Sequence, residues 1–163
     1  MKNITTSSIK ELLGIAIKAE IDSNKVYSHL SNSVENPLLK EKFQMLANEE
    51  NKHKILLERF FETLYHNKKI PIPDTSSQFP TPKISSDPST PFVEIIYQAM
   101  NFEKESQQFY LELSKKFENR RRSVFEYLSK VEESHYMMLK SEYEIAQEFE
   151  DYPRMKEFDR IVT

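Results

Sequence analysis

An internal repeat at helical spacing is the feature of this sequence that most restricts its fold. Residues 16–30 match a segment 83 residues further along the chain, and residues 43–57 match a segment 82 residues further along. The matched pairs include Glu20 with Glu103, Tyr27 with Tyr110, Glu50 with Glu132 and His53 with His135. A repeat of this kind indicates one supersecondary unit used twice, so the chain is predicted to contain two copies of one helical hairpin.

The spacing of core-type residues within each repeat is typical of helices in a bundle. These residues follow one another at alternating intervals of four and three, as in Leu39, Phe43, Leu46 and Glu50. The only glycine in the 163 residues is Gly14, and we expect close packing against another helix to explain its place inside a helix. The predicted helices cover about residues 8–33, 37–65, 91–118 and 120–149, with a short C-terminal helix at 155–161 as a further expectation.

Capping residues mark the expected ends of these helices. Ser8 followed by Glu11 forms a capping-box pattern. Asn36 and Thr90 each precede a proline, which is the arrangement of an N-cap residue followed by proline at the first helical position. Asn119 is expected to mark the turn between the third and fourth helices.

Residues 66–90 are expected to form a long extended connection, because five prolines fall there among serines and threonines. At ~3 Å per residue, such a segment can run back along a helix of roughly 45 Å. A crossover of this length lets the second and third helices run parallel, whereas a short loop would make them antiparallel. The sequence therefore predicts a single all-α domain over residues 1–163, with two antiparallel hairpins joined by this crossover.

Four glutamates and two histidines are predicted to meet at one level in the core of the bundle. Within each Glu-x-x-His pair, the two side chains lie one turn apart on one helix face. Glu20 lies about 13 residues before its turn and Glu50 about 14 after it, so the antiparallel helices bring them together. The same holds around Asn119. The complete set is Glu20, Glu50, His53, Glu103, Glu132 and His135.

A metal site explains this set better than chance or a structural role. A glutamate three residues before a histidine is common by chance, because 21 of the 163 residues are glutamate. Two such pairs at matching repeat positions, level with single glutamates from the other helices, are not. Burying four carboxylates together costs several kcal/mol each and adds like-charge repulsion. Two divalent cations would neutralise that charge.

Carboxylate oxygens with two imidazole nitrogens suit iron or manganese, and zinc is kept as an alternative. The sequence has no cysteine, which excludes thiolate-bound zinc and iron–sulfur clusters held by these residues. Glu50 and Glu132 are favoured as bridging or chelating carboxylates, but which carboxylates bridge is left open.

Tyr27 and Tyr110 follow their glutamates by two turns. Each either donates a hydrogen bond that orients a ligand carboxylate, has a redox role, or is a core tyrosine satisfied locally. Glu49 is expected to face away from the site, because its repeat equivalent is Val131. Glu105 is expected to be solvated and is kept only as a spare ligand.

This combination of residues resembles the di-iron domain of rubrerythrin, a member of the ferritin-like superfamily. The resemblance covers roughly residues 8–148 and rests on the two Glu-to-Tyr spacings, the two Glu-x-x-His pairs and the proline-rich crossover. It implies a ferritin-like four-helix bundle, two iron ions, reduction of hydrogen peroxide and an external electron donor.

This chain differs from typical rubrerythrins in two respects. It has no cysteine to hold the iron of a rubredoxin domain, so only the di-iron domain is expected. Met100 and Ser106 stand one turn from Glu103, where the family carries an extra ligating glutamate. Oxygen reduction and ferroxidase or iron-handling chemistry are therefore alternatives to peroxide reduction, and a metal-free helical interaction module is a further alternative.

Charge and hydropathy restrict the partners. The formal net charge of −3 and the absence of a long basic stretch argue against nucleic acid. No apolar run reaches membrane-spanning length and the first residues lack the apolar core of a signal peptide, so a cytoplasmic protein is expected. Two similar hairpins and an exposed crossover make a homodimer an additional expectation.

Overall fold

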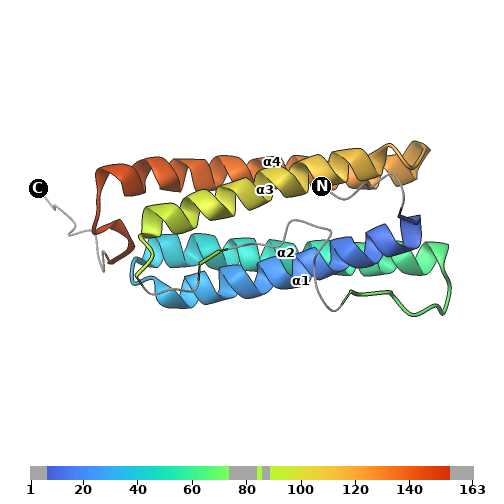
Figure 1. Cartoon of the computed structure of the whole chain (residues 1–163), viewed down its shortest axis with the longest axis horizontal. Helices are drawn as coiled ribbons and strands as arrows, with labels where there is room; N and C mark the ends of the chain where they lie inside the picture. Colours follow the sequence, from blue (N-terminus) through green and yellow to red (C-terminus); the bar gives the residue numbers. More distant parts are fainter. Residues whose placement is uncertain (1–6, 74–83, 86–88, 155–163) are drawn as a thin grey trace, which may run out of the picture.

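Four long helices form a bundle of two antiparallel hairpins (Figure 1). The computed structural model describes residues 7–73, 84–85 and 89–154, and no strand occurs in these ranges. The predicted all-α fold and its hairpin pairing are confirmed. The helices are α1 (Ile9–Ser33), α2 (Pro37–Leu64), α3 (Phe92–Ser114) and α4 (Asn119–Glu148), followed by the short 3-10 helix η1 (Tyr152–Arg154).

Side-chain caps start the two helices of the first hairpin as predicted. The backbone N–H of Glu11 donates to Ser8 Oγ at 3.2 Å, and the N–H of Ser8 donates to Glu11 Oε2 at 2.8 Å. Asn36 Oδ1 accepts from two backbone N–H groups at the start of α2. The prediction for Thr90 was wrong: α3 starts after Pro91 with no side-chain cap. The Thr90 hydroxyl instead lies 2.7 Å from Ser85 Oγ.

The end of α3 also differs from its prediction. The helix ends at Ser114, four residues before the expected end near 118. The N–H of Lys116 donates to the carbonyl of Leu113 at 3.0 Å, so the chain leaves the helix through a tighter turn with hydrogen bonds between residues three apart. Asn119 lies in the turn as expected, with φ of 52°, a left-handed conformation that asparagine tolerates.

The crossover makes α2 and α3 run in the same direction (Figure 1), as its length predicted. Its first residues pack on α1: a Cβ atom added to Gly14 would lie 2.2 Å from the carbonyl oxygen of Pro71. The prediction that Gly14 allows close packing of another helix was therefore wrong. The segment that packs against Gly14, where a side chain would clash, is the backbone of the crossover.

Two apolar clusters fill the bundle on either side of its middle. One contains Leu13, Phe60 and Phe125, and the other contains Phe43, Ile96 and Leu139. The predicted Glu and His set belongs to neither cluster, and in α1, α2 and α4 its residues lie between the buried members of the two clusters along the helix. Buried apolar side chains thus pack on both sides of the set.

The chain after α4 is fastened to the turn between α1 and α2. Asn36 Nδ2 donates to the carbonyl of Tyr152 at 3.0 Å, and the Tyr152 hydroxyl donates to the buried Glu142 at 2.5 Å. Glu142 also pairs with Lys42 of α2. The further helix expected at 155–161 lies outside the described residues. None of the helices described here has the length and apolar character that crossing a membrane requires.

Candidate metal centre

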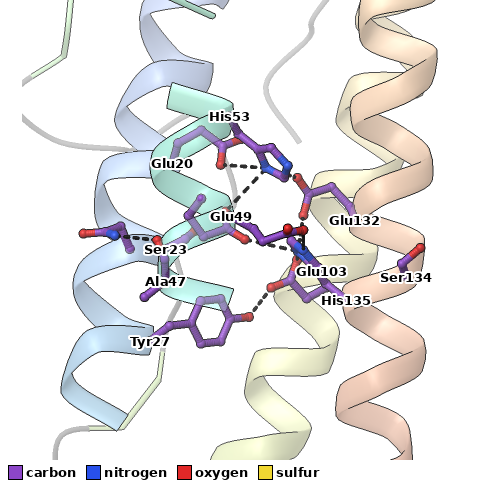
Figure 2. Close-up of polar contacts among 12 residues, drawn as sticks. Glu20, Ser23, Tyr27, Ala47, Glu49, His53, Glu103, Glu132, Ser134 and His135 are labelled. Atoms are coloured by element: carbon purple, nitrogen blue, oxygen red, sulfur yellow. Dashed lines mark hydrogen bonds and ion pairs between the residues drawn. The ribbon is translucent and has the colours of Figure 1, made fainter. Parts of the chain in front are cut away.

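All six predicted side chains meet in the middle of the bundle. Each helix supplies one glutamate, and α2 and α4 each add a histidine one turn further on. None of the six residues is more than 4% exposed. Figure 2 shows Glu20, His53, Glu103, Glu132 and His135 pointing toward one another between the helices. The repeat therefore placed its polar residues at one level, as the spacing predicted.

The imidazole of His53 turns its Nδ1 atom toward three carboxylates. Nδ1 lies 3.1 Å from Glu132 Oε1, 3.5 Å from Glu20 Oε2 and 4.0 Å from Glu50 Oε2. These glutamates come from α4, α1 and α2. One histidine nitrogen thus faces oxygens from three helices.

His135 repeats this arrangement in the other half. Its Nδ1 lies 3.1 Å from Glu50 Oε1, 3.3 Å from Glu132 Oε2 and 3.7 Å from Glu103 Oε2. The two rings stack with centroids 5.7 Å apart. Glu50 and Glu132 therefore each direct one carboxylate oxygen toward each histidine.

Two groups of potential ligands result, and they share two members. The first position is made by Glu20, Glu50, His53 and Glu132, and the second position by Glu50, Glu103, Glu132 and His135. Within each group, the donor atoms all lie within 4.8 Å of one another. Donors about 2.1 Å from one ion are roughly 3.0 Å apart in an octahedron and roughly 3.4 Å apart in a tetrahedron. The N–O distances of 3.1–4.0 Å are close to those spacings.

Buried polar atoms that lack a hydrogen-bond partner support a cation site here. Among the described residues, seven buried side-chain atoms have no hydrogen-bond partner, and all seven belong to the Glu and His set. They include both oxygens of Glu132 and the Nδ1 atoms of both histidines. Leaving buried polar atoms unpaired is costly, and ionised groups cost the most. Metal ions bound by these atoms would remove that cost, so the residues fit the predicted group.

The pKa values of these groups are shifted by burial and by the charges of their neighbours. Burial raises the pKa of Glu50 well above its usual value, and the neighbouring carboxylates raise it further. Burial likewise raises the pKa of Glu103 to about 8. Burial would lower the pKa of His53, but the surrounding carboxylates raise it to about 10. Burial would raise the pKa of Glu132, but the two imidazoles beside it hold that pKa below its usual value.

Tyr27 and Tyr110 each bind a glutamate of the opposite hairpin. The Tyr27 hydroxyl of α1 donates to Glu103 Oε1 of α3 (Figure 2), and the Tyr110 hydroxyl of α3 donates to Glu20 Oε1 of α1. The structure thus contains the hydrogen bond to a glutamate of the set that the sequence offered as one alternative. These bonds leave Oε2 of Glu20 and Glu103 directed at the histidines.

Glu49 does not face away, and that prediction was wrong. Its Oε2 atom lies 3.3 Å from His135 Nε2, across the contact between α2 and α4. Partial burial would raise the pKa of Glu49, but the hydrogen bond and charge of His135 lower it below its usual value. A sequence signal existed: Glu49 precedes His53 by four residues, which places both on the side of α2 that faces α4.

The other neighbours add no ligand. Glu105 is exposed and belongs to neither position. Met100 and Ser106 are buried one turn from Glu103 but bring no carboxylate. Within the described part of the chain, the ligand groups are thus confined to the six predicted residues.

Comparisons with known proteins agree with this architecture. The family model for rubrerythrin matches residues 11–143. A solved structure of a hypothetical protein from Pyrococcus furiosus is similar to this chain, with a TM-score of 0.82 and 29% sequence identity over 90% of this chain and 95% of the other. A search of curated proteins found no match.

Proposed function

Because the chain belongs to the rubrerythrin family, we propose that it is a non-haem di-iron oxidoreductase that reduces hydrogen peroxide or oxygen. The observation that carries the proposal is the sharing of Glu50 and Glu132 between two groups of buried ligands. Such sharing suits a pair of ions. Since both hairpins contribute to both positions, we treat residues 1–163 as one domain.

The residues have separate tasks in this proposal. Glu20 and His53 would hold the first ion and Glu103 and His135 the second, and Glu50 and Glu132 belong to both ligand groups. Two iron ions would supply the two electrons that, with two protons, convert one hydrogen peroxide into two waters. The tyrosine hydroxyls fix the terminal carboxylates Glu20 and Glu103 by one oxygen each. The apolar clusters on both sides limit the entry of bulk water.

The donor set is compatible with three metals. Carboxylate oxygen and imidazole nitrogen suit iron and manganese, and also accept zinc. The family's chemistry requires a metal that changes oxidation state, which disfavours zinc; iron is proposed as the family's metal, and manganese is the alternative. Electrons must then be returned by an external donor, which is the partner that this proposal requires.

A ferroxidase or iron-handling role is the second candidate. The observation that favours it is the six-residue ligand set, in which Met100 and Ser106 stand near Glu103 and supply no seventh carboxylate. Such a protein would oxidise incoming Fe(II) and release or store it. A metal-free interaction module is the remaining alternative.

Anaerobic Fe(II) titration followed by rapid mixing separates these functions. The proposed function predicts two Fe(II) per chain, followed by oxidation that is much faster with hydrogen peroxide or oxygen than in a control lacking the ligands. Faster oxidation by peroxide than by oxygen supports a peroxidase. The reverse result, with iron retained beyond two per chain, supports iron handling.

Glu50→Ala is the control that lacks one of the shared ligand residues. Glu133→Ala is the matched control, because Glu133 lies beside Glu132 in the sequence but contacts Lys130 on the surface. No uptake of Fe(II) by the unaltered chain would rule out both metal functions.

A further inference from the structure

The two metal positions differ in what stands behind their histidines. Behind His135, Glu49 Oε2 lies 3.3 Å from Nε2 (Figure 2). The repeat equivalent of Glu49 in α4 is Val131, whose side chain has no atom that can accept a hydrogen bond. The repeat that gives both positions the same ligands therefore does not give them the same support.

The two ring nitrogens of His135 face different partners. Nδ1 faces the carboxylates of Glu50, Glu103 and Glu132, while Nε2 faces Glu49. With Nδ1 as the ligand atom, Nε2 carries the proton, and this N–H donates a hydrogen bond to the Glu49 carboxylate. A carboxylate that accepts this bond fixes the tautomer, holds the ring in place and makes the ligand nitrogen more basic.

Glu49 is itself held in place and reaches solvent. Its other oxygen, Oε1, lies 3.6 Å from Lys52 Nζ one turn further along α2. Its side chain is 34% exposed, whereas that of His135 is 4% exposed. Removing the charge of Glu49 should therefore leave the packing of the core intact, which makes the residue a suitable point for substitution.

We propose that Glu49 is a positioning residue that makes the second position, with Glu103 and His135, the tighter metal site of the pair. The proposal rests on the two-ion site of the proposed function. It concerns a difference between positions, so metal binding alone does not establish it.

Chains that keep one position each provide the test. Glu20→Gln removes the terminal carboxylate of the first position and leaves the second, while Glu103→Gln does the opposite; glutamine can still accept the tyrosine hydrogen bond. Co(II) is the probe, titrated without oxygen against a competing chelator and followed by its visible absorption. Adding Glu49→Gln should weaken Co(II) binding about 10–100-fold in the Glu20→Gln chain. In the Glu103→Gln chain the change should stay within about threefold, and only the Co(II) spectrum of the second position should shift.

Two further variants sharpen the result. Glu133→Gln should leave both affinities unchanged, because Glu133 is partly exposed and pairs with Lys130 in the described part of the chain. Val131→Glu in the Glu103→Gln chain should tighten the first position, because it supplies the missing carboxylate. If single-position chains bind too weakly, the full chain gives the same answer: its tighter Co(II) step should be lost in Glu49→Gln.

Equal weakening of both positions, or no weakening of either, would overturn the proposal. Equal weakening would show a general effect on folding, which far-UV circular dichroism would register as well. If the unaltered chain binds two Co(II) and Glu49→Gln behaves like it, only this inference fails. If the unaltered chain binds no metal, the proposed function fails first.

Discussion

The two hairpins of this protein agree at the site and differ around it. Both supply a single glutamate, a Glu-x-x-His pair and a tyrosine that binds the opposite hairpin. They differ at Glu49 against Val131, at Gly14 against Tyr97, and in how their first helices begin. The candidate ligands and their tyrosines are repeated, whereas these other residues are not.

The largest effect should come from the shared carboxylates. Glu50→Ala or Glu132→Ala should remove both metal positions and weaken binding more than about 100-fold, because each lost carboxylate serves both histidines. Glu20→Ala or Glu103→Ala should remove only one position and leave one metal per chain. Metal analysis after loading and desalting checks both results. Two metals retained at full occupancy in Glu50→Ala would contradict the ligand assignment.

The tyrosines should show that the hairpins are equivalent at the site. Tyr27→Phe and Tyr110→Phe each remove a buried hydroxyl that donates to a carboxylate. Each should lower the free energy of unfolding of the metal-free chain by about 1.5–3 kcal/mol, and the two losses should agree within about 1 kcal/mol. Urea denaturation in the presence of a chelator measures both. A large loss for one tyrosine and none for the other would show that the two hydrogen bonds do not contribute equally to stability.

Gly14 should show where the hairpins stop being equivalent. In Gly14→Ala the new Cβ meets the Pro71 carbonyl, so the crossover has to move. The overpacking should exceed the gain in helix propensity and lower the free energy of unfolding by about 1–2 kcal/mol. Tyr97, its equivalent in α3, is 46% exposed and contacts Tyr143, so Tyr97→Ala should cost less than about 1 kcal/mol. A stabilised Gly14→Ala would mean that the crossover does not pack there.

The helix starts should give the smallest difference. Ser8→Ala removes a capping box and should cost about 1 kcal/mol. Thr90→Ala should cost about half of that or less, because Thr90 caps no helix and its hydroxyl lies 2.7 Å from Ser85 Oγ. Thermal unfolding of the two variants compares them directly. Equal losses would show that the two starts are energetically alike.

The fold and the six side chains of the site could be predicted from the sequence because they follow from periodicity. Spacings of three and four residues define one helix face, and a repeat shows which polar residues on that face recur. Glu50 was preferred over Glu49 on this basis, since the repeat keeps Glu132 and replaces the other residue by Val131. Long helices with one seam leave little freedom for these side chains once the hairpins close.

The errors came from contacts that periodicity does not describe. Glu49 is next to the seam residue Glu50, and its side chain reaches His135 of α4. Gly14 is explained by Pro71 of an irregular segment, whose path no pattern encodes. Thr90 had a suitable sequence for a cap, but the hydroxyl found another partner in Ser85. In each case a tertiary contact decided the outcome.

The central claim is that Glu50 and Glu132 are shared between two metal ions. A crystal structure of the protein loaded with Fe(II) without oxygen, with anomalous data collected at the iron edge, tests it most directly. The account predicts two iron peaks per chain, one beside Glu20 and His53 and the other beside Glu103 and His135, with both shared carboxylates contacting both peaks. A single peak, or a pair of peaks that Glu50 and Glu132 do not join, would contradict it.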